Sequence, residues 1–426
     1  MQRIQIGLVG LGTIGGGLLA LLSENAKLIA RRTGIDFQIT RIADKDPAKF
    51  SKLKNVKASA DYKDIINDPD IQIVVELTGG VDFPWKLFQE TVESGKHFVT
   101  ANKALLSKKL LSMFELSRKN QAYIGFEASV GGGIPIIKTL RYSLVGNKIL
   151  SIDGIINGTT NYILTQMTDK KLPFSEALKK AQELGFAEAD PTLDINGDDA
   201  ASKIAILASL SFNQNISRDD VYLEGIENIE LIDIQNAQEL DYTVKLVATC
   251  KIHEGDQVEL RVHPTFVSND NPLSQVENEY NAILVDSDFL GESMYYGKGA
   301  GARPTASAVI SDIVELGSKI CSKKGYNEHF FSLENSKKIK PISDIPSKFY
   351  VRIMTKDEPG ILAKVTKVFG DNHISIASVI QKDTGKEFIP LVFCTHEAKE
   401  KNFQNSFQQI KSFNFVEKIV YYRTAD

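Results

Sequence analysis

The sequence predicts an α/β protein of more than one domain, with a doubly wound parallel sheet at its N-terminal end. Three observations support this fold class. Short apolar segments alternate with helix-like segments over residues 1–130, and a glycine-rich turn follows the first apolar segment. The last part of the chain has the order β-α-β-β-α-β. A chain of 426 residues is long enough for two or three such domains.

Residues 1–134 are expected to form the parallel sheet and its covering helices. Each helix carries the chain back across a face of the sheet, so successive strands run parallel. The expected strands are 4–9, 37–43, 71–77, 97–100 and 123–127, and the expected helices are 18–30, 62–67, 84–94 and 107–120.

The remainder of the chain predicts two further domains. Residues 135–303 are less regular and favour a mixed α+β domain, and residues 333–347 have the lysines and prolines of a linker. Residues 348–426 favour a ferredoxin-like module. In the middle domain the expected helices are 135–145, 160–168, 174–184 and 198–213, with strands at 149–156, 244–254, 257–266 and 281–287; in the module the expected strands are 349–355, 375–381, 388–395 and 416–422, with helices at 360–371 and 398–412.

The glycine turn predicts a dinucleotide site. Gly10, Gly12 and Gly15 have the GxGxxG spacing directly after the first strand and at the start of a helix. In a Rossmann-type domain the first glycine permits the tight turn, the second lets the backbone approach the pyrophosphate, and the third lets helix and strand pack closely. The helix N-terminus adds partial positive charge for the phosphates.

The end of the second strand gives conflicting cues about the nucleotide. Asp44 could accept a hydrogen bond from the adenosine 2′-hydroxyl and favour NAD, whereas Lys45, with Lys57, could balance the 2′-phosphate of NADP. A solvated charge cluster at a strand end is the plainer alternative for the lysines. The sequence therefore predicts NAD or NADP without choosing between them.

Composition excludes several classes of protein. The net charge is −4, so no strongly basic field is available for a nucleic acid. The three cysteines are widely spaced and odd in number, which argues against a disulfide framework. Residues 4–22 are apolar but six glycines interrupt them, unlike a signal peptide, and no stretch reaches the ~20 apolar residues of a membrane span. We expect a cytoplasmic protein.

The predicted helix after residue 197 has an anomalous polar pair. Asp199 and Lys203 are four residues apart and share one helix face, whose next members are Ile206 and Leu210. A routine surface ion pair would sit on a more charged face. A lysine and a carboxylate on an otherwise apolar helix therefore predict a catalytic site.

Neighbouring residues fit the reduction of a carbonyl group. Negative charge develops on the carbonyl oxygen as hydride reaches the carbon, and an ammonium stabilises that charge and can deliver the proton. Lys203 suits this role with Asp199 orienting it, and Lys103, just after a strand of the parallel sheet, is a second candidate. Glu188 and Asp194 could receive a substrate ammonium, although alone they read as a solvated loop.

Taken together, these segments resemble the homoserine dehydrogenase family. The resemblance runs over essentially the whole chain and in the family's order. Its specific strings are GLGTIG at 10–15, VVELTGG at 74–80, TANKALL at 100–106, FEASVGGGIPII at 126–137, NGTTNYIL at 157–164, GFAEADPTLDINGDDAASK at 185–203 and GAGARPTASAVISDI at 299–313.

The resemblance implies roles for individual residues. Lys203 and Lys103 would be the catalytic lysines beside Asp199, with Glu188 and Asp194 holding the substrate amino group. The residues along the cofactor would include Thr13, Ile14, Thr78, Lys103 and Gly301, and a helix at about 304–330 would return to complete the nucleotide domain. Backbone carbonyls of the loop Glu127, Val130, Gly132 and Ile134 would bind sodium, for which a plain glycine turn is the alternative.

The C-terminal module resembles an ACT domain. The Pro359-Gly360 turn opens a helix whose amides could meet an amino-acid carboxylate. The resemblance implies threonine, the pathway product, as the effector, and a homodimer or homotetramer; a purely structural module is the alternative. Threonine inhibition is expected to disappear on deletion of residues 345–426. Two competing functions are another Rossmann amino-acid dehydrogenase and a non-catalytic amino-acid sensor.

Overall fold

The computed structural model describes residues 1–53, 56–322, 326, 333–381 and 387–426. Contacts between residues divide the chain into two compact units. Unit 1 contains 1–158, 199–221 and 279–337, and unit 2 contains 159–198, 222–278 and 338–426. The domain boundaries predicted from the sequence follow a different division and remain predictions. No helix in the described part of the chain is long and apolar enough to cross a membrane.

A six-stranded parallel sheet forms the first part of unit 1. Its order is β3-β2-β1-β4-β5-β6, and every neighbouring pair is parallel. The strands are β1 (Gln2–Val9), β2 (Ile35–Ala43), β3 (Lys57–Ser59), β4 (Ile71–Glu76), β5 (His97–Thr100) and β6 (Ile124–Gly125). This order confirms the predicted doubly wound sheet: strands are added outward on one side from β1 to β3 and on the other side from β4 to β6, and the order reverses between β1 and β4.

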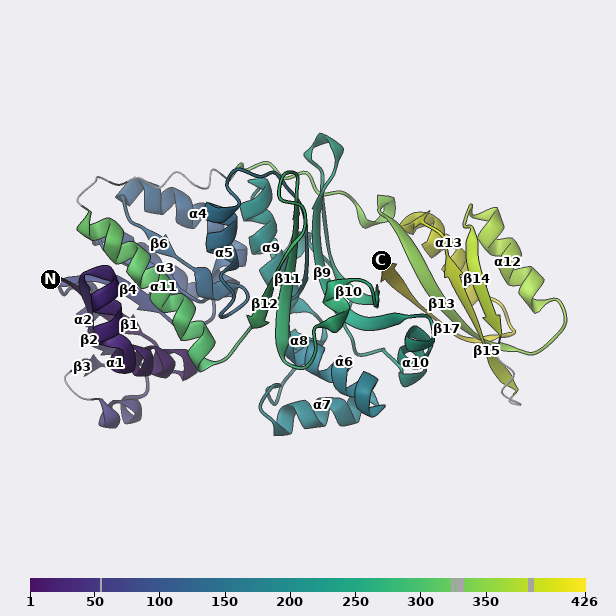
Figure 1. Cartoon of the computed structure of the whole chain (residues 1–426), viewed down its shortest axis with the longest axis horizontal. Coiled ribbons are helices and arrows are strands. Elements are labelled where there is room, and N and C mark those ends of the chain that lie inside the picture. Colours follow the sequence, from purple (N-terminus) through teal and green to yellow (C-terminus); the bar gives the residue numbers. More distant parts are fainter. Residues whose placement is uncertain (54–55, 323–325, 327–332, 382–386) are drawn as a thin grey trace. The chain divides into compact units, whose positions relative to one another are not determined.

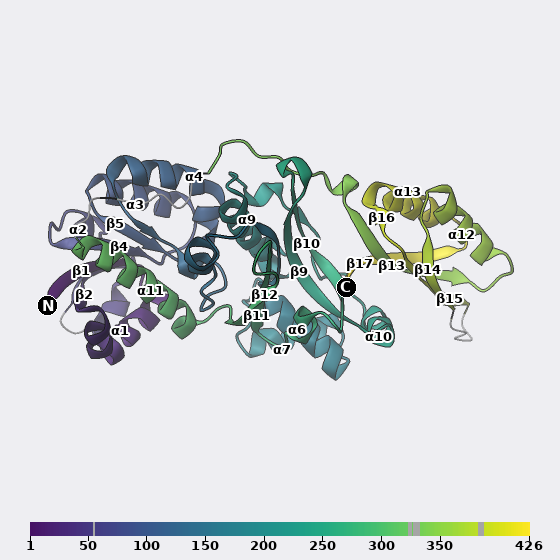
Figure 2. The same cartoon turned by 45° about the horizontal axis from the view of Figure 1, so that its top comes forward.

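Helices cover both faces of this sheet. On one face α1 (Thr13–Thr33) lies beside α11 (Ala302–Cys321), and on the other α3 (Asp82–Glu93) lies beside α4 (Lys103–Asn120) (Figures 1 and 2). Leu18 of α1 and Val309 of α11 enter the same apolar core as the strands. The helix expected at about 304–330 is thus present to Cys321; its residues 323–325 and 327–330 lie outside the described ranges.

The rest of unit 1 carries the helix with the polar pair. This is α9 (Asp198–Phe212), whose residues from Ile204 to Leu210 are buried. An antiparallel sheet of β7 (Ile149–Ile155), β11 (Tyr280–Ser287) and β12 (Ser293–Lys298) belongs to the same unit. The helix expected at 135–145 divides into α5 (Ile136–Lys138) and a π-helical turn at Thr139–Ser143, closed by the Leu144 amide on the Thr139 carbonyl.

Unit 2 contains a sheet in the order β9-β10-β17-β13-β15-β14. β17 pairs parallel with β10, and all other neighbours are antiparallel. The strands are β9 (Tyr242–Ile252), β10 (Val258–Ser268), β13 (Pro346–Lys356), β14 (Ile376–Gln381), β15 (Phe388–Thr395) and β17 (Val416–Ala425), with two-residue strands β8 (Tyr222–Leu223) and β16 (Ala398–Lys399) beside β10 and β13. The helices are α6 (Gly158–Lys170), α7 (Phe174–Glu183), α8 (Thr192–Ile195), α10 (Leu231–Glu239), α12 (Ile361–Asp371) and α13 (Glu400–Lys411).

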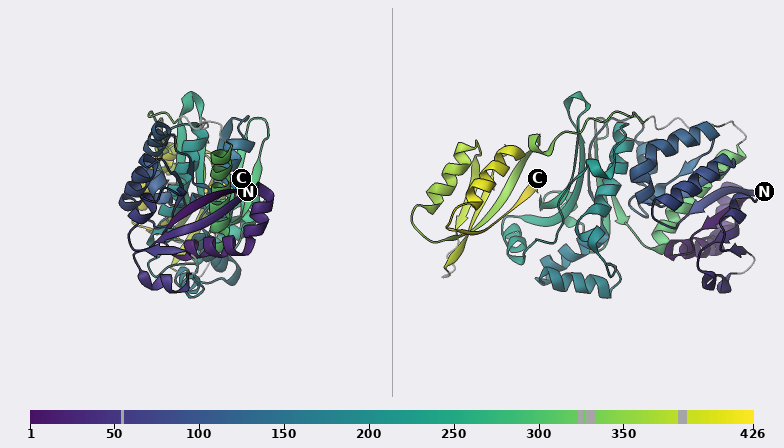
Figure 3. Two further views of the ribbon diagram at one scale, coloured as in Figure 1. Left: turned by 90° about the vertical axis from the view of Figure 1, so that its left-hand side faces the viewer. Right: turned by 180° about the vertical axis from the view of Figure 1, so that it is seen from behind.

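The C-terminal module has the predicted ferredoxin-like arrangement. Its strand order β17-β13-β15-β14 follows from the β-α-β-β-α-β sequence, and α12 and α13 lie together on one face (Figure 3, right). Phe349 of β13 stacks on Phe403 of α13 at 3.8 Å between ring centroids. Together with Phe369 of α12 these rings fill the core of the module.

The expected linker is fastened to both units by backbone hydrogen bonds. In unit 1, the Glu334 amide donates to the Asn213 carbonyl, and its carbonyl accepts the Asn215 amide. In unit 2, Val258 exchanges backbone hydrogen bonds with Lys338 and Lys340. The segment is irregular because it runs between two such attachments and not because it is free of the domains.

Candidate active site

The glycine turn between β1 and α1 has the geometry of a pyrophosphate cradle. Gly10 has φ +98°, and a Cβ there would lie 2.6 Å from the Leu77 carbonyl oxygen. A Cβ on Gly15 would lie 2.4 Å from the Gly10 carbonyl oxygen, so helix and turn touch through backbone alone. A Cβ on Gly12 would meet nothing within 4 Å, which leaves its face open to a ligand. Three glycines are needed here for three different reasons.

The first turn of α1 faces the same cradle. Thr13 and Ile14 begin the helix; Thr13 is exposed, and Ile14 packs partly against the apolar core. Gly301 immediately precedes α11 with φ +111°, and the start of that helix meets α1 where a Cβ on Gly17 would lie 2.6 Å from the Ala302 carbonyl oxygen. Thr13, Ile14 and Gly301, three of the residues expected along the cofactor, thus lie at the beginning of α1 or of the helix packed on it.

Asp44 ties the end of β2 to the glycine turn. Its carboxylate accepts the Leu11 amide at 2.6 Å, the Asp46 amide at 2.9 Å and the Lys49 ammonium at 3.0 Å. Burial acts to raise the pKa of Asp44, but these hydrogen bonds and the charge of Lys49 hold it below its usual value. Lys49 is a partner that the sequence interpretation missed, and Lys45 lies over the ring of Phe83.

A hollow of about 700 Å³ opens beside Asp44. It is wide enough for the adenosine half of a dinucleotide. Its lining comprises Val9, Gly10, Gly12, Ala43, Asp44, Lys45, Lys49, Ala60, Asp61, Tyr62, Leu77, Thr78, Gly79 and Phe83. The open face of Gly12 and this hollow together fit a nicotinamide dinucleotide.

Glu76 organises the loops at the carboxyl end of the sheet. This fully buried carboxylate, the last residue of β4, accepts the Thr78 amide and hydroxyl at 2.6 and 2.7 Å and the Thr100 hydroxyl at 2.6 Å. The Thr100 hydroxyl in turn accepts the Asn102 amide, and Asn102 caps the helix that Lys103 begins. Glu76 was not singled out from the sequence, although a carboxylate closing an apolar strand was the available signal.

Asp199 joins the two lysines. Its oxygens lie 2.7 Å from the Lys103 ammonium and 2.7 Å from the Lys203 ammonium. Asn157, directly after β7, donates to the same carboxylate at 2.9 Å, and Lys203 also donates to the Ile156 carbonyl oxygen at 2.7 Å. Burial would raise the pKa of Asp199, but the two lysines hold it far below its usual value.

The burial of this cluster separates it from a surface ion pair. The Asp199 side chain is 7% exposed and Lys203 is 12% exposed, whereas Lys103 is 46% exposed. One carboxylate therefore holds a nearly buried ammonium and a half-exposed one side by side. Such a pair can bind a carbonyl oxygen and move a proton to or from it.

The acidic residues upstream of α9 belong to unit 2. Asp194 in α8 accepts the Thr159 hydroxyl at 3.1 Å, and the same hydroxyl donates to the Phe186 carbonyl oxygen at 2.7 Å. Glu188 is exposed, and its carbonyl oxygen accepts the Gln182 amide side chain at 3.2 Å. Asp194 thus has a fixed position within the unit.

The loop expected to bind a cation is held by backbone contacts. Gly131 and Gly132 have φ +71° and +55°, and a Cβ on Gly132 would lie 2.4 Å from the Gly299 carbonyl oxygen. The Glu127 carboxylate accepts the amides of Ile137 and Lys138. Burial, with the nearby charge of Asp312, raises the pKa of Glu127 to about 7. The carboxylate is thus committed to amides, which leaves carbonyl oxygens as the ligands this loop offers.

Two further observations bear on cation binding. The Ile134 carbonyl oxygen already accepts the Ile136 amide at 2.9 Å and keeps one lone pair for a cation. Among the described residues, no group of three histidine, cysteine, aspartate or glutamate residues could hold a metal. A cation in this loop would therefore be held by neutral oxygens.

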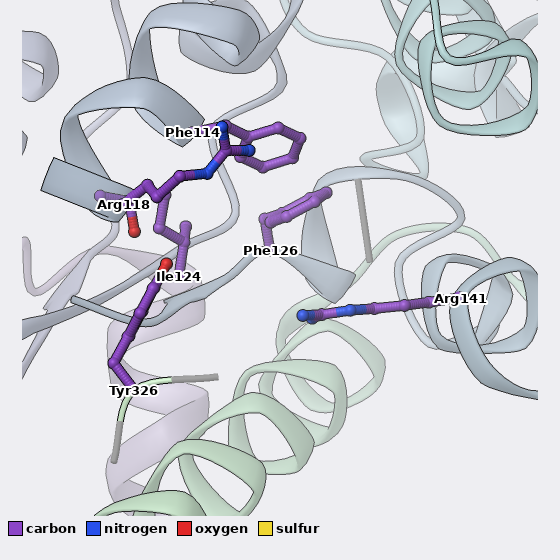
Figure 4. Close-up of a pocket in the computed structure, with 7 residues that line it drawn as sticks. Phe114, Arg118, Ile124, Phe126, Arg141 and Tyr326 are labelled. Atoms are coloured by element: carbon purple, nitrogen blue, oxygen red, sulfur yellow. The ribbon is translucent and has the colours of Figure 1, made fainter. Parts of the chain in front are cut away.

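A second, small hollow lies at the other end of α4 (Figure 4). Arg118 and Arg141 come from opposite sides of the view, with Phe126 between them (Figure 4). Tyr326 closes it, and the neighbours of Tyr326 in the chain lie outside the described ranges. This hollow contains none of the residues predicted for the site.

Family models match three parts of the chain. Homoserine dehydrogenase matches residues 135–314, its NAD binding domain matches residues 10–127, and the ACT domain matches residues 349–414. The homoserine dehydrogenase of Helicobacter pylori is 42% identical over 416 residues, which cover 97% of each chain. That of Neisseria gonorrhoeae is 39% identical over 426 residues, with 98% of this chain and 97% of the relative covered. This chain belongs to the homoserine dehydrogenase family.

Solved structures agree with this membership. A homoserine dehydrogenase from Thiobacillus denitrificans superposes with a TM-score of 0.95 at 38% identity, covering 100% of this chain and 99% of that one. A hyperthermophilic archaeal homoserine dehydrogenase in complex with NADPH has a TM-score of 0.64 at 27% identity, covering 76% of this chain and all of that one. The predicted family, the fold class and the ACT domain are confirmed. As a homoserine dehydrogenase family member, the chain is an NAD(P)-dependent oxidoreductase.

Proposed function

We propose that this protein interconverts L-aspartate 4-semialdehyde and L-homoserine with a nicotinamide nucleotide, on the route to threonine, methionine and isoleucine. The observation that carries the proposal is that one buried carboxylate, that of Asp199, lies 2.7 Å from the ammonium groups of both Lys103 and Lys203. A carbonyl reductase needs such a cation where the oxygen becomes negative.

The lysines act on the substrate oxygen. A bound nicotinamide supplies the hydride that adds to the aldehyde carbon. Lys203, held by Asp199 and the Ile156 carbonyl, binds the oxygen and stabilises its growing charge. Lys103, the more exposed of the two, delivers the proton that completes the alcohol and recovers one from solvent. In the oxidative direction the same group takes the hydroxyl proton.

Two carboxylates of unit 2 are the candidates for recognition of the substrate amino group. Asp194 is oriented by the Thr159 hydroxyl, and Glu188 is exposed and open to a ligand. Both are assigned to the substrate ammonium, which an anionic pair binds well. A substrate that lacks the amino group would then lose binding at these residues.

Replacing Lys203 by alanine tests the assignment. We expect the variant to lose most of kcat, since the oxygen loses its cation, while fluorescence titration shows unchanged affinity for NADPH. Turnover equal to wild type would refute the role of Lys203. Release of ammonia during oxidation would favour an amine-oxidising dehydrogenase instead, and failure to oxidise homoserine with either nucleotide would favour a non-catalytic sensor.

The nucleotide site is assigned to both NADPH and NADH. Asp44 can accept a ribose 2′-hydroxyl, while Lys45 and Lys49 line the same hollow and can balance a 2′-phosphate. We expect Lys49→Met to lower kcat/KM for NADPH relative to NADH, and Asp44→Asn to shift the ratio toward NADPH. A ratio that neither variant changes would place the discrimination elsewhere.

A sodium ion is assigned to the carbonyl oxygens of Glu127, Val130, Gly132 and Ile134. The two positive-φ glycines curve the loop, and its Glu127 carboxylate is already committed to amides. We expect the thermal unfolding midpoint to be higher in NaCl than in choline chloride of equal ionic strength. Identical midpoints and rates in the two salts would refute the site.

The ACT domain is assigned a regulatory role with threonine as effector. A hollow of about 460 Å³ lies at the Pro359-Gly360 turn, where Gly360 has φ +88° and precedes α12. The amides there can bind a carboxylate. We expect threonine to inhibit the enzyme and Leu362→Arg, which fills the hollow, to relieve inhibition. We assign the protein to the cytoplasm. We also propose a homodimer or homotetramer, and light scattering on the purified protein would measure which of the two forms.

A further inference from the structure

Residues 222–239, which we call the bridging segment, connect the ACT strands to the turn before α9. The segment contains β8 and α10. Three of its side chains, Glu224, Glu230 and Asp233, are carboxylates that pair with arginines of the ACT domain. The sequence interpretation assigned no role to any of them.

The first pair is centred on Arg423 of β17, which is 1% exposed. Its guanidinium donates to Glu224 at 3.1 and 3.2 Å and to Glu400 of α13 at 2.7 and 3.0 Å. The hydroxyls of Tyr222 and Tyr421 also donate to Glu224. Burial acts to raise the pKa of Glu224, but Arg423 and these donors hold it below its usual value.

The second pair is centred on Arg352 of β13, which is 2% exposed. It donates to Asp233 at 2.6 and 2.8 Å and to Glu230 at 2.5 Å. The Tyr350 hydroxyl donates to Asp233 at 3.0 Å. Arginines of two adjacent ACT strands therefore bind the start and the middle of the bridging segment, and bidentate buried pairs of this kind fix orientation as well as distance.

The other side of the bridging segment packs on the turn 194–197. The Ile226 amide donates to the Ile195 carbonyl oxygen at 2.8 Å. A Cβ on Gly225 would lie 2.5 Å from that oxygen and 2.8 Å from the Cα of Asn196, and a Cβ on Gly197 would lie 2.7 Å from Leu223. The contacts of Gly225 are with backbone atoms, which cannot yield as the end of the Leu223 side chain can, so a movement of Gly225 toward the turn must displace the turn.

This turn contains Asp194 and is followed directly in the chain by α9. We propose that Glu224 is a positioning residue for homoserine binding: held by Arg423 of the ACT domain, it sets the place of the turn and thereby of the Asp194 carboxylate. The inference rests on the proposed role of Asp194 in binding the substrate ammonium. Through Glu224, the last strand of the ACT domain supports the substrate site even when no effector is bound.

A matched pair of variants tests the proposal on the full-length enzyme. Glu224→Gln and Glu400→Gln each remove one of the two carboxylates on the same arginine, but only Glu224 lies beside the turn. We expect Glu224→Gln to raise KM for homoserine about tenfold, with KM for NADP and kcat changed less than about threefold. Glu400→Gln should leave both KM values as in wild type.

A steric variant provides the second measurement, which decides alone if Glu224→Gln does not fold. Gly225→Ala pushes on the Ile195 carbonyl without changing charge, and Gly370→Ala in α12 is its control because a Cβ there meets nothing within 4 Å. A rise in homoserine KM for Gly225→Ala but not for Gly370→Ala supports the proposal. Equal effects of Glu224→Gln and Glu400→Gln, or an unchanged homoserine KM in Gly225→Ala, would overturn it.

Asp194→Asn separates this inference from the proposed function. If Asp194→Asn raises homoserine KM while Glu224→Gln and Gly225→Ala do not, Asp194 binds substrate and the bridging segment does not position it. If Asp194→Asn has no effect, the assignment of Asp194 itself is wrong, and the positioning role of Glu224 fails with it.

Discussion

Replacing Asp199 by asparagine removes the charge that holds Lys103 and Lys203, the two lysines of the proposed site. The substitution preserves the shape of the side chain and one carbonyl oxygen. It replaces the other oxygen by an amide group that cannot accept a hydrogen bond, so one of the two ammonium groups at 2.7 Å loses its acceptor. The variant therefore isolates the orienting role of the carboxylate from the role of the lysines.

The size of the effect follows from the contact that is lost. A hydrogen bond to a charged group contributes about 1.5–3 kcal/mol. If about 2–3 kcal/mol of orientation is lost from the transition state, kcat falls about 30- to 150-fold. Cofactor affinity should not change, because Asp199 has no contact with the glycine turn among its described partners.

The assay is steady-state oxidation of homoserine, with NADPH affinity measured separately by fluorescence. Asp220→Asn is the matched control, since Asp220 also pairs with a lysine, Lys337, at 2.6 Å, outside the proposed site. Asp220→Asn should lower the free energy of unfolding and leave kcat within about twofold of wild type. A kcat for Asp199→Asn within about threefold of wild type would refute the view that this carboxylate positions the lysines.

Three further predictions follow from the same structure. Gly12→Ala should weaken NADPH binding in a fluorescence titration with little change in the thermal unfolding midpoint. Gly15→Ala, whose Cβ would lie 2.4 Å from a carbonyl oxygen, should lower that midpoint by several degrees. Gly16→Ala, whose Cβ would meet nothing within 4 Å, should change neither the affinity nor the midpoint. The pKa of Asp199 is depressed by its lysines against the opposing effect of burial, so the stability it adds is present above the unfolded pKa of about 3.9 and is lost as pH falls below it. Between pH about 4 and 2, the free energy of unfolding measured with denaturant should therefore fall more steeply for wild type than for Asp199→Asn. Parallel pH dependences of the two proteins would contradict the depressed pKa. Glu76→Gln should weaken NADPH binding and lower kcat about tenfold, because Thr78 and the Thr100-Asn102 connection lose their shared acceptor. Glu183→Gln, which removes an exposed ion pair with Lys179 in α7, should do neither.

Local patterns in the sequence were sufficient for the parallel sheet, the glycine turn and the polar pair on α9. These features depend on residues close in the chain: strand periodicity, GxGxxG spacing, and the four-residue separation of Asp199 and Lys203. The fold class could be predicted correctly because these patterns are local. The short strand β3, the strand β12 and the helix α10 were not predicted, because their apolar patterns are too brief or too weak to distinguish from loops.

Contacts between distant residues were out of reach of the sequence. Lys103 and Asp199 are separated by 96 positions, and only the folded chain shows that one carboxylate serves both lysines. Asn157 was missed for the same reason, because 42 positions separate it from Asp199. Arg423 and Arg352 lie in strands in which apolar and polar residues alternate, and in such a strand a charged residue is expected to face solvent. Each arginine is buried because it pairs with a carboxylate more than 100 positions away in the chain.

The parallel pairing of β10 with β17 has a consequence for synthesis of the chain. β10 ends at Ser268 and β17 begins at Val416, so the backbone of Thr265–Val267, which pairs with Arg423–Ala425, stays open while the intervening residues are made. An open edge strand of mostly apolar residues invites pairing with another nascent chain. Early termination within β17 should therefore yield aggregates and not a shortened enzyme, and chaperone occupancy on the ribosome should persist until β17 has emerged.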